Sequence, residues 1–439
     1  AKSVHDVSDD LPLSRKIFGN LPLKWTRGYN LTREKEILIP FDWFFSINEF
    51  NGPSAGNCQE EALIQGICEI VERHTSSVVS HKKLKVAAIR PQSVSDPLAV
   101  EMLQKYKNTG VDLYLSDFSL DTGIPTVGVL AHDPATFPHL SEIVWTAGTT
   151  PNPQKALGRA LTEVAQLAGD FNTGANYVAS GLPKFSTIEE ADFVINPEKE
   201  LDINDLPDLS DNNLKSEILN CLSALAANDM EVLAINTMHS QLAIPAFYTV
   251  IPGAHFRERS LGTSVAMFSA KHIFENRPTK EAILELEAID KMLPGKYYVH
   301  FYLGACSLAI NDPKTALTCL RRALTLNPTK QDIPSIYSYL GIALKEMGEY
   351  RQALENLQEG KKLDGRRTDI YNLMGFCHFK LKEYERAIEN FKKVIELDPS
   401  SAIDYANIAS NYRDMGKTEL AILHYKLALD SGDPSQRTR

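Results

Sequence analysis

Two periods of hydrophobic residues alternate along roughly the first 262 residues of the chain. Apolar positions that recur every three or four residues predict helices, whereas alternating or β-branched runs predict strands. The expected helices span 59–82, 95–108, 153–170 and 211–227, and the expected strands span 111–117, 124–131, 231–236 and 247–251. Residues 182–212 are rich in Pro, Asp, Glu and Asn and are expected to form a surface loop or partial linker. Strands interleaved with helices indicate an α/β or α+β domain.

The expected helix at 59–82 has a polar face and an apolar face. The polar stripe comprises Glu61, Gln65, Glu69, Glu72 and Arg73, and the apolar arc comprises Leu63, Ile64, Ile67, Ile70 and Val71. Residues 51–57 form a glycine-rich turn before it, where backbone N–H groups can hold a phosphate. The stripe has the side chains needed for Mg²⁺ and nucleotide phosphates, yet many surface helices solvate a similar face. Taken alone, the spacing favours the solvated face.

The second half of the chain repeats itself. Four small residues recur at spacings of 37, 34 and 34, and an alanine follows each of them twelve positions later. The small residues are Gly304, Gly341, Gly375 and Ala409, and the alanines are Ala316, Ala353, Ala387 and Ala421. This pattern resembles the tetratricopeptide repeat, in which small residues let paired helices approach and the pairs stack into a solenoid. Such a solenoid offers a concave surface for protein binding and no chemistry of its own.

These patterns predict the organisation of the chain. We expect a mixed α+β domain at 1–265, a helical connector at 266–294 and about four tetratricopeptide repeats at 295–435. The fold class is therefore an α+β domain followed by an all-α solenoid.

The composition of the chain limits the classes of molecule that it is expected to bind. The chain has 439 residues and a net charge of -10, without a basic tract, which argues against binding to nucleic acid or to an anionic membrane. It has no apolar run of the roughly 20 residues that a membrane span requires. The six cysteines are scattered without a CxxC pair, as is typical of a reducing compartment. We therefore expect a cytoplasmic protein.

Three motifs in order resemble the YcaO family. Residues 51–73 resemble its NG-x-SAGN turn and the EA-xxx-G-xxE-xxER helix that follows. Residues 153–166 resemble its AL-xRxLTE-xxQ signature, and residues 244–253 resemble its late strand and Pro-Gly turn. The resemblance spans about residues 20–255. It implies a domain that binds ATP and Mg²⁺ and activates a peptide backbone amide, either by phosphorylating its oxygen or by otherwise using ATP to remove it. Phosphorylation converts a poor leaving group into a good one, and the transfer needs positive charge and metal-bridged phosphates.

The resemblance also implies roles for particular residues. The implied Mg²⁺ ligands are Glu61, Glu69, Glu72 and Glu163. The implied phosphate-contacting and catalytic residues are Arg73 and Arg159, and the implied nucleotide-binding residues are these two arginines with Ser54, Asn57 and Gln65. Arg159 and Glu163 lie four residues apart on one helical face, which in isolation is more typical of a surface ion pair.

The chain departs from the family pattern in two places. The family has an earlier acidic helix, SxxxExxER, that completes the metal shell, but only 50 residues precede Asn51 and none forms that pattern. Either the polypeptide lacks an N-terminal portion or the protein is a degenerate member; Ala1 in place of Met favours the first explanation. The proline-rich tail of azoline-forming members is also missing, which argues against a standard peptide cyclodehydratase.

Two functions remain open at this level. The first is an enzyme that uses ATP and Mg²⁺ to modify a peptide or protein, with the repeats binding the substrate or a protein partner. The second is a non-catalytic or degenerate nucleotide-binding adaptor that acts through the repeats, for example an accessory factor for modification of a ribosomal protein. An oligomer such as a dimer is compatible with either. No Walker loop, kinase loop or DFG element occurs in the sequence, which argues against an ordinary kinase-like enzyme.

Overall fold

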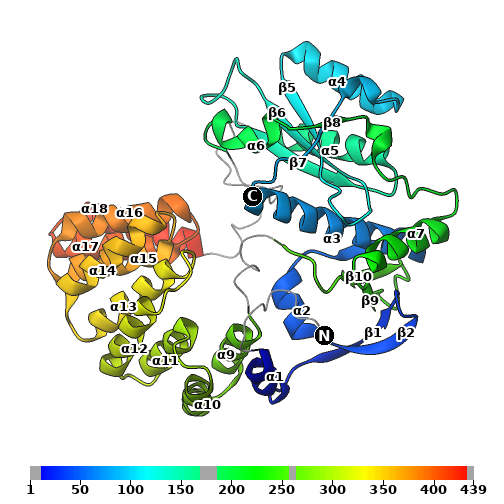
Figure 1. The fold of residues 1–439 in the computed structure, drawn as a ribbon. Helices are drawn as coiled ribbons and strands as arrows, with labels where there is room; N and C mark the ends of the chain where they lie inside the picture. The colour runs from blue at the N-terminus through cyan, green and yellow to red at the C-terminus, as the bar shows by residue number, and fades with distance from the viewer. Residues whose placement is uncertain (1–10, 169–184, 257–263, 433–439) are drawn as a thin grey trace. The chain divides into compact units, whose positions relative to one another are not determined.

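The computed structural model describes residues 11–168, 185–256 and 264–432, which form two compact units. Of these residues, the first unit contains 22–168, 185–256 and 264, and the second contains 11–21 and 265–432. Figure 1 shows the first as a mixed α/β unit and the second as a stack of helices. The expected fold class, an α+β domain followed by an all-α solenoid, is confirmed.

The first unit holds two five-stranded sheets. The first sheet has the order β2-β1-β9-β10-β3 and is antiparallel throughout. Its strands are β1 (Trp25–Asn30), β2 (Lys35–Pro40), β3 (Pro53–Ala55), β9 (Leu233–Asn236) and β10 (Ala246–Val250). The second sheet has the order β7-β6-β5-β4-β8 and ends in a parallel pair. Its strands are β4 (Ala88–Ile89), β5 (Asp112–Asp117), β6 (Thr126–His132), β7 (Val144–Thr149) and β8 (Glu200–Leu201).

Helices cover both faces of the second sheet. The helices of this unit are α2 (Phe41–Asn48), α3 (Gln59–Lys82), α4 (Pro97–Thr109), α5 (Pro153–Ala168), α6 (Asp192–Ile195) and α7 (Leu214–Ala227). Successive residues of a strand face opposite sides, so Val129 packs with the residues of α4 and α5, whereas Leu130 packs with those of α3 and α6. Helix α3 also contacts β3 and β10 of the first sheet, and it therefore lies between the two sheets (Figure 1).

The expected elements of the first unit all occur, with boundaries shifted by a few residues. The exception is the segment 182–212, whose described part (185–212) was wrongly predicted as a surface loop. It contains the short helices η2 (Ile188–Ala191), α6 and η3 (Ile203–Asp205) together with β8, which pairs with β4. Phe193 and Ile203 are buried in the two cores that flank the second sheet. The prediction failed because the apolar run that begins at Phe193 is only three residues long and Ile203 stands alone between polar residues, so neither shows a helical or strand period.

The second unit is built from paired helices. They are α1 (Leu11–Gly19), α9 (Val265–Asn276), α10 (Thr279–Met292), α11 (Tyr297–Ala309), α12 (Pro313–Thr325), α13 (Ile333–Glu346), α14 (Tyr350–Leu363), α15 (Thr368–Lys380), α16 (Tyr384–Leu397), α17 (Ala402–Asp414) and α18 (Thr418–Gly432). In three of the repeats a glycine of the first helix meets a large residue of the second: a Cβ on Gly304 or Gly375 would lie 2.7 Å from Leu320 or Phe391, and one on Gly341 would lie 2.5 Å from Leu357. The tetratricopeptide prediction is confirmed.

Candidate functional site

Helix α3 begins and ends with defined caps. The Cys58 sulfur accepts a hydrogen bond from the backbone N–H of Glu61 at 3.4 Å, and Lys83 adopts the left-handed conformation after the last turn. Its apolar residues Ile67 and Ile70 are fully buried. Gly66 lets the helix approach the first sheet, because a Cβ there would lie 2.3 Å from Thr249 Oγ1 and 2.7 Å from Ser54 Oγ. The helix is therefore held in one position between the sheets.

The glycine-rich turn is fastened to the first half of α3. Gly52 adopts a φ of +99°, and its N–H donates to Glu69 Oε2 at 3.0 Å. The backbone N–H and the side-chain amide of Asn57 donate to Glu61 Oε2 at 2.7 and 2.9 Å. Ser54 Oγ donates to the carbonyl of Ala62 at 2.7 Å. Four of the expected site residues, Ser54, Asn57, Glu61 and Glu69, thus make hydrogen bonds between the turn and the helix.

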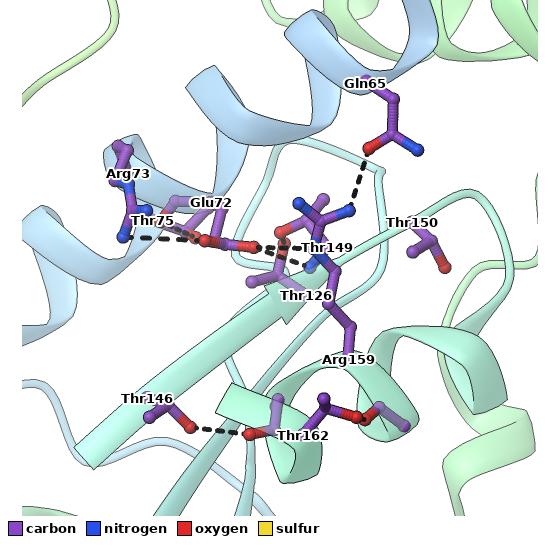
Figure 2. Close-up of polar contacts among 12 residues, drawn as sticks. Gln65, Glu72, Arg73, Thr75, Thr126, Thr146, Thr149, Thr150, Arg159 and Thr162 are labelled. Carbon is purple, nitrogen blue, oxygen red and sulfur yellow. Dashed lines mark hydrogen bonds and ion pairs between the residues drawn. The ribbon is translucent and has the colours of Figure 1, made fainter. Parts of the chain in front are cut away.

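The second half of α3 carries a buried carboxylate. Glu72 is only 3% exposed, so at this position the face is not solvated. Its Oε2 accepts a hydrogen bond from the backbone N–H of Thr149 at 3.1 Å and lies 3.9 Å from Arg159 Nε, while its Oε1 lies 3.6 Å from Arg73 Nη1 (Figure 2). Gln65 Oε1 accepts a hydrogen bond from Arg159 Nη1 at 2.9 Å. The amide of Gln65 therefore orients the guanidinium that faces Glu72.

Burial and the neighbouring charges have opposing effects on the pKa of Glu72. Burial raises the pKa of Glu72 from 4.5 to about 7, although Arg73, Arg159 and the hydrogen bond from Thr149 act to lower it. The carboxylate of Glu163, on α5, also raises the pKa of Glu72. Burial raises the pKa of Glu163 in turn, against the lowering effect of the two arginines. We call Gln65, Glu72, Arg73, Arg159 and Glu163 the Glu72 cluster.

The structure separates the expected site residues into two groups. The Glu72 cluster brings together residues of both sequence motifs, from α3 and α5. Glu61 lies eleven residues before Glu72 on the same helix, which corresponds to roughly 16 Å along its axis. Within residues 11–168, 185–256 and 264–432, no three His, Cys, Asp or Glu side chains form a group that could hold a metal ion. The four expected carboxylates are therefore not assembled as one ligand set.

Sequence reasoning missed the contribution of the strand β7. Thr149, its last residue, donates to Glu72 through the backbone, and its hydroxyl lies 2.7 Å from that of Thr126 on β6 (Figure 2). A backbone donor leaves no trace in side-chain patterns. The nearest available signal was the position of Thr149, at the end of a strand that leads into the α5 motif.

Comparison with known proteins identifies the first unit. Residues 5–255 match the model of a family described as YcaO cyclodehydratase, ATP- and Mg²⁺-binding. The match covers more than half of the chain. The chain belongs to the YcaO family. Residues 300–403 match a second model, the tetratricopeptide domain of cytochrome c-type biogenesis protein H.

The YcaO relatives are distant. An uncharacterised protein of Methanothermobacter thermautotrophicus is 24% identical over 251 residues, which are 53% of this chain and 65% of that protein. The ribosomal protein S12 methylthiotransferase accessory factor YcaO of Escherichia coli is 27% identical over 146 residues, which are 32% of this chain and 24% of the factor. The chain thus spans less than two thirds of the length of these curated relatives.

Solved structures resemble each unit. The heterocyclase TruD aligns with a TM-score of 0.47 and 21% identity over 55% of this chain and 36% of its own. YcaO from Methanopyrus kandleri, bound with AMPPCP and Mg²⁺, aligns with a TM-score of 0.44 and 25% identity over 52% of this chain and 64% of its own. MamA aligns with a TM-score of 0.33 and 25% identity over 35% of this chain and 88% of its own.

Proposed function

We propose that this YcaO protein binds ATP and Mg²⁺ at the Glu72 cluster and uses ATP to phosphorylate the oxygen of a peptide backbone amide. The observation that carries the proposal is the buried Glu72 carboxylate, set between two arginines and beside a second carboxylate. The family is ATP- and Mg²⁺-binding by its description, and both of its characteristic helices contribute to this cluster.

The donor set fits magnesium and phosphate. Mg²⁺ in nucleotide sites is usually held by one or two carboxylates together with the phosphates and water, and Glu72 and Glu163 supply two carboxylates. Arg73 and Arg159 supply guanidinium groups that match phosphate oxygens. The pKa of about 7 at Glu72 indicates that the two arginines do not offset the burial of its charge. A divalent cation beside Glu72 would offset it, which supports metal binding here.

Each residue of the cluster has a proposed task. Glu72 and Glu163 hold the metal, while Arg73 and Arg159 neutralise the charge that develops on the transferring phosphoryl group. Gln65 orients Arg159, and Thr149 fixes the Glu72 carboxylate through its N–H. MgATP would supply the phosphoryl group: its transfer to the amide oxygen would release ADP, and attack of a nucleophile on the amide carbon would then expel that oxygen as inorganic phosphate.

The glycine-rich turn is proposed as the second part of the nucleotide site. Ser54 and Asn57 lie on it, next to the first turn of α3, where backbone N–H groups favour an anion. Glu61 and Glu69 accept the hydrogen bonds of Asn57 and Gly52 through their Oε2 atoms. Each carboxylate has a second oxygen, Oε1, that could bind a metal while the turn keeps these hydrogen bonds.

The repeats are proposed to bind the substrate or a protein partner. Tetratricopeptide solenoids present the first helix of each pair on a concave surface, here α11, α13, α15 and α17.

No helix among the described residues is long and apolar enough to cross a membrane. All six cysteines are free thiols, which supports a cytoplasmic location.

Isothermal titration calorimetry with Mg²⁺ and ATP tests the proposal. We expect the wild-type chain to bind and Glu72→Gln to weaken binding by about tenfold or more, because the variant removes a metal ligand. Glu101→Gln is the matched control: Glu101 is an exposed carboxylate on α4 that pairs with Lys105, and its loss leaves the affinity unchanged. Equal affinity of Glu72→Gln and wild type would refute the assignment. Absence of binding by the wild type would favour the adaptor that acts through its repeats.

A further inference from the structure

The outward face of the last helix differs from that of the earlier repeats. The second helices of the four repeats can be aligned on their alanines, Ala316, Ala353, Ala387 and Ala421. The outward face of each helix then consists of three residues: the one directly before the alanine, the one two positions after it and the one six positions after it. These positions are Thr315, Thr318 and Arg322 in α12, Gln352, Glu355 and Glu359 in α14, Arg386, Glu389 and Lys393 in α16, and Leu420, Leu423 and Leu427 in α18. The face is polar or charged in three helices and entirely leucine in the fourth.

The three leucines form one exposed stripe. They follow the i, i+3, i+7 spacing of a single helix face and are 40%, 51% and 36% exposed. A stripe of this kind exposed to water is unfavourable, and it is typical of a surface that another helix covers. We call Leu420, Leu423 and Leu427 the α18 stripe.

The stripe is not the face on which a solenoid continues. Within the stack, α16 faces the next helix through Ile388 and Ile395, which pack in the same cluster as Ile408 of α17. The equivalent residues of α18, 34 positions later, are Ile422 and Leu429. They lie on the side of α18 away from the stripe. A further helix stacked on the solenoid would cover those two residues and leave the stripe exposed.

Charges beside the stripe select the orientation of the covering helix. Glu419 and Lys426 lie seven residues apart on the same flank of the stripe, and both are exposed. Two helices related by a two-fold axis and running antiparallel bring the same flanks together with their directions reversed. Glu419 of one copy then faces Lys426 of the other, twice. In this pairing Leu420 falls between Leu423 and Leu427 of the second copy, so the stripes interdigitate.

We propose that α18 is a dimerisation helix, which pairs antiparallel with α18 of a second copy of this chain through the α18 stripe. The apolar stripe provides the association energy, and the two Glu419–Lys426 pairs fix the antiparallel register. The interface lies within the tetratricopeptide unit and does not depend on nucleotide binding by the first unit.

Sedimentation velocity of the full chain over a range of concentrations tests the dimer. We expect a monomer–dimer equilibrium in the wild type and at least about a tenfold weaker dimer in Leu423→Glu, which buries a charge in the stripe. Ile422→Glu is the matched control on the other face of the same helix and leaves the equilibrium unchanged. Both residues are exposed in the single chain, so far-ultraviolet circular dichroism should match the wild type. A wild-type monomer at all concentrations, or dissociation by Ile422→Glu but not by Leu423→Glu, overturns the proposal.

Charge reversal tests the orientation separately. Glu419→Lys and Lys426→Glu each place like charges opposite one another, and each is expected to weaken the dimer by about tenfold. The double variant Glu419→Lys/Lys426→Glu restores opposite charges and should recover wild-type affinity. Additive loss in the double variant would rule out the antiparallel pairing.

Discussion

Glu72 is almost fully buried, and it lies beside two arginines. Burial prevails, because the pKa of Glu72 rises from 4.5 to about 7 despite both positive charges and a backbone N–H donor. Near neutral pH the protonated form of the carboxyl group is therefore populated, unlike that of an ordinary glutamate. Metal ions bind the ionised carboxylate, so metal binding and deprotonation of Glu72 must be linked.

This linkage predicts proton release on binding of MgATP. Each molecule bound should release a fraction of a proton from Glu72, and this fraction should rise toward one as the pH falls below about 7 and vanish well above it. The proton count follows from calorimetric enthalpies measured at each pH in two buffers of different ionisation enthalpy that do not bind Mg²⁺, with Mg²⁺ in excess so that the nucleotide is already complexed. A count that does not change between pH 6 and 8.5 would mean that Glu72 does not titrate on binding.

Gly66 shows how one residue sets the position of an element. It lies where α3 meets the first sheet, and a Cβ there would lie 2.3 Å from Thr249 Oγ1. Two of the nearest atoms belong to short side chains on β3 and β10 that have little freedom to move. An added methyl group must therefore displace the helix or distort the strands.

Gly66→Ala is predicted to destabilise the first unit by about 1–3 kcal/mol. Gly158→Ala is the matched control, because Gly158 is also helical and has no atom within 4 Å of a Cβ; there alanine should stabilise the helix by about 0.5–1 kcal/mol. All three tryptophans, Trp25, Trp43 and Trp145, lie in the first unit. Urea unfolding followed by tryptophan fluorescence therefore measures both changes, and a stabilising Gly66→Ala would contradict the close approach.

A helix or strand could be predicted from the sequence when its own residues show a regular pattern of apolar positions, and not when contacts with distant residues determine it. The helix at 59–82, the described part of the helix at 153–170 and the tetratricopeptide helices were correctly predicted, because each repeats its apolar positions over several turns. The segment 185–212 was not, since Phe193 and Ile203 are buried by contacts with distant residues. The same holds for the sheet register, where Tyr29 pairs with Ala234, about two hundred residues away.

The sequence also predicted which residues of the candidate site lie together, but only in part. The motifs supplied Glu72, Arg73, Arg159 and Glu163, and the structure brings these four near one another. The helical period also placed Glu61 and Glu69 on the same face of the helix as Glu72. Residues that share a face can still lie far apart along the helix axis, so a shared face does not show that they share a site. Their hydrogen bonds with Asn57 and Gly52 are produced by the fold of the turn, which the spacing did not show.

At the scale of the whole chain, the clearest long-range contact is that of α1 with helices much later in the sequence. This helix lies near the start of the sequence, yet it belongs to the helical unit, where it contacts α9. Ile17 is 5% exposed and packs in the same cluster as Ala270 and Ile273. Residues about 250 positions later in the chain thus form its core.

Ile17→Ala is therefore predicted to destabilise the helical unit and not the unit that contains the tryptophans. Truncation of a buried isoleucine should cost about 2–4 kcal/mol, and it should shift the unfolding midpoint seen by circular dichroism at 222 nm more than the one seen by tryptophan fluorescence. Leu13→Ala, on the same helix but 39% exposed, is the matched control and should shift neither by much. If Ile17→Ala shifts the fluorescence midpoint and leaves the helical signal unchanged, α1 stabilises the first unit instead, and the division of the chain is wrong at its N-terminus.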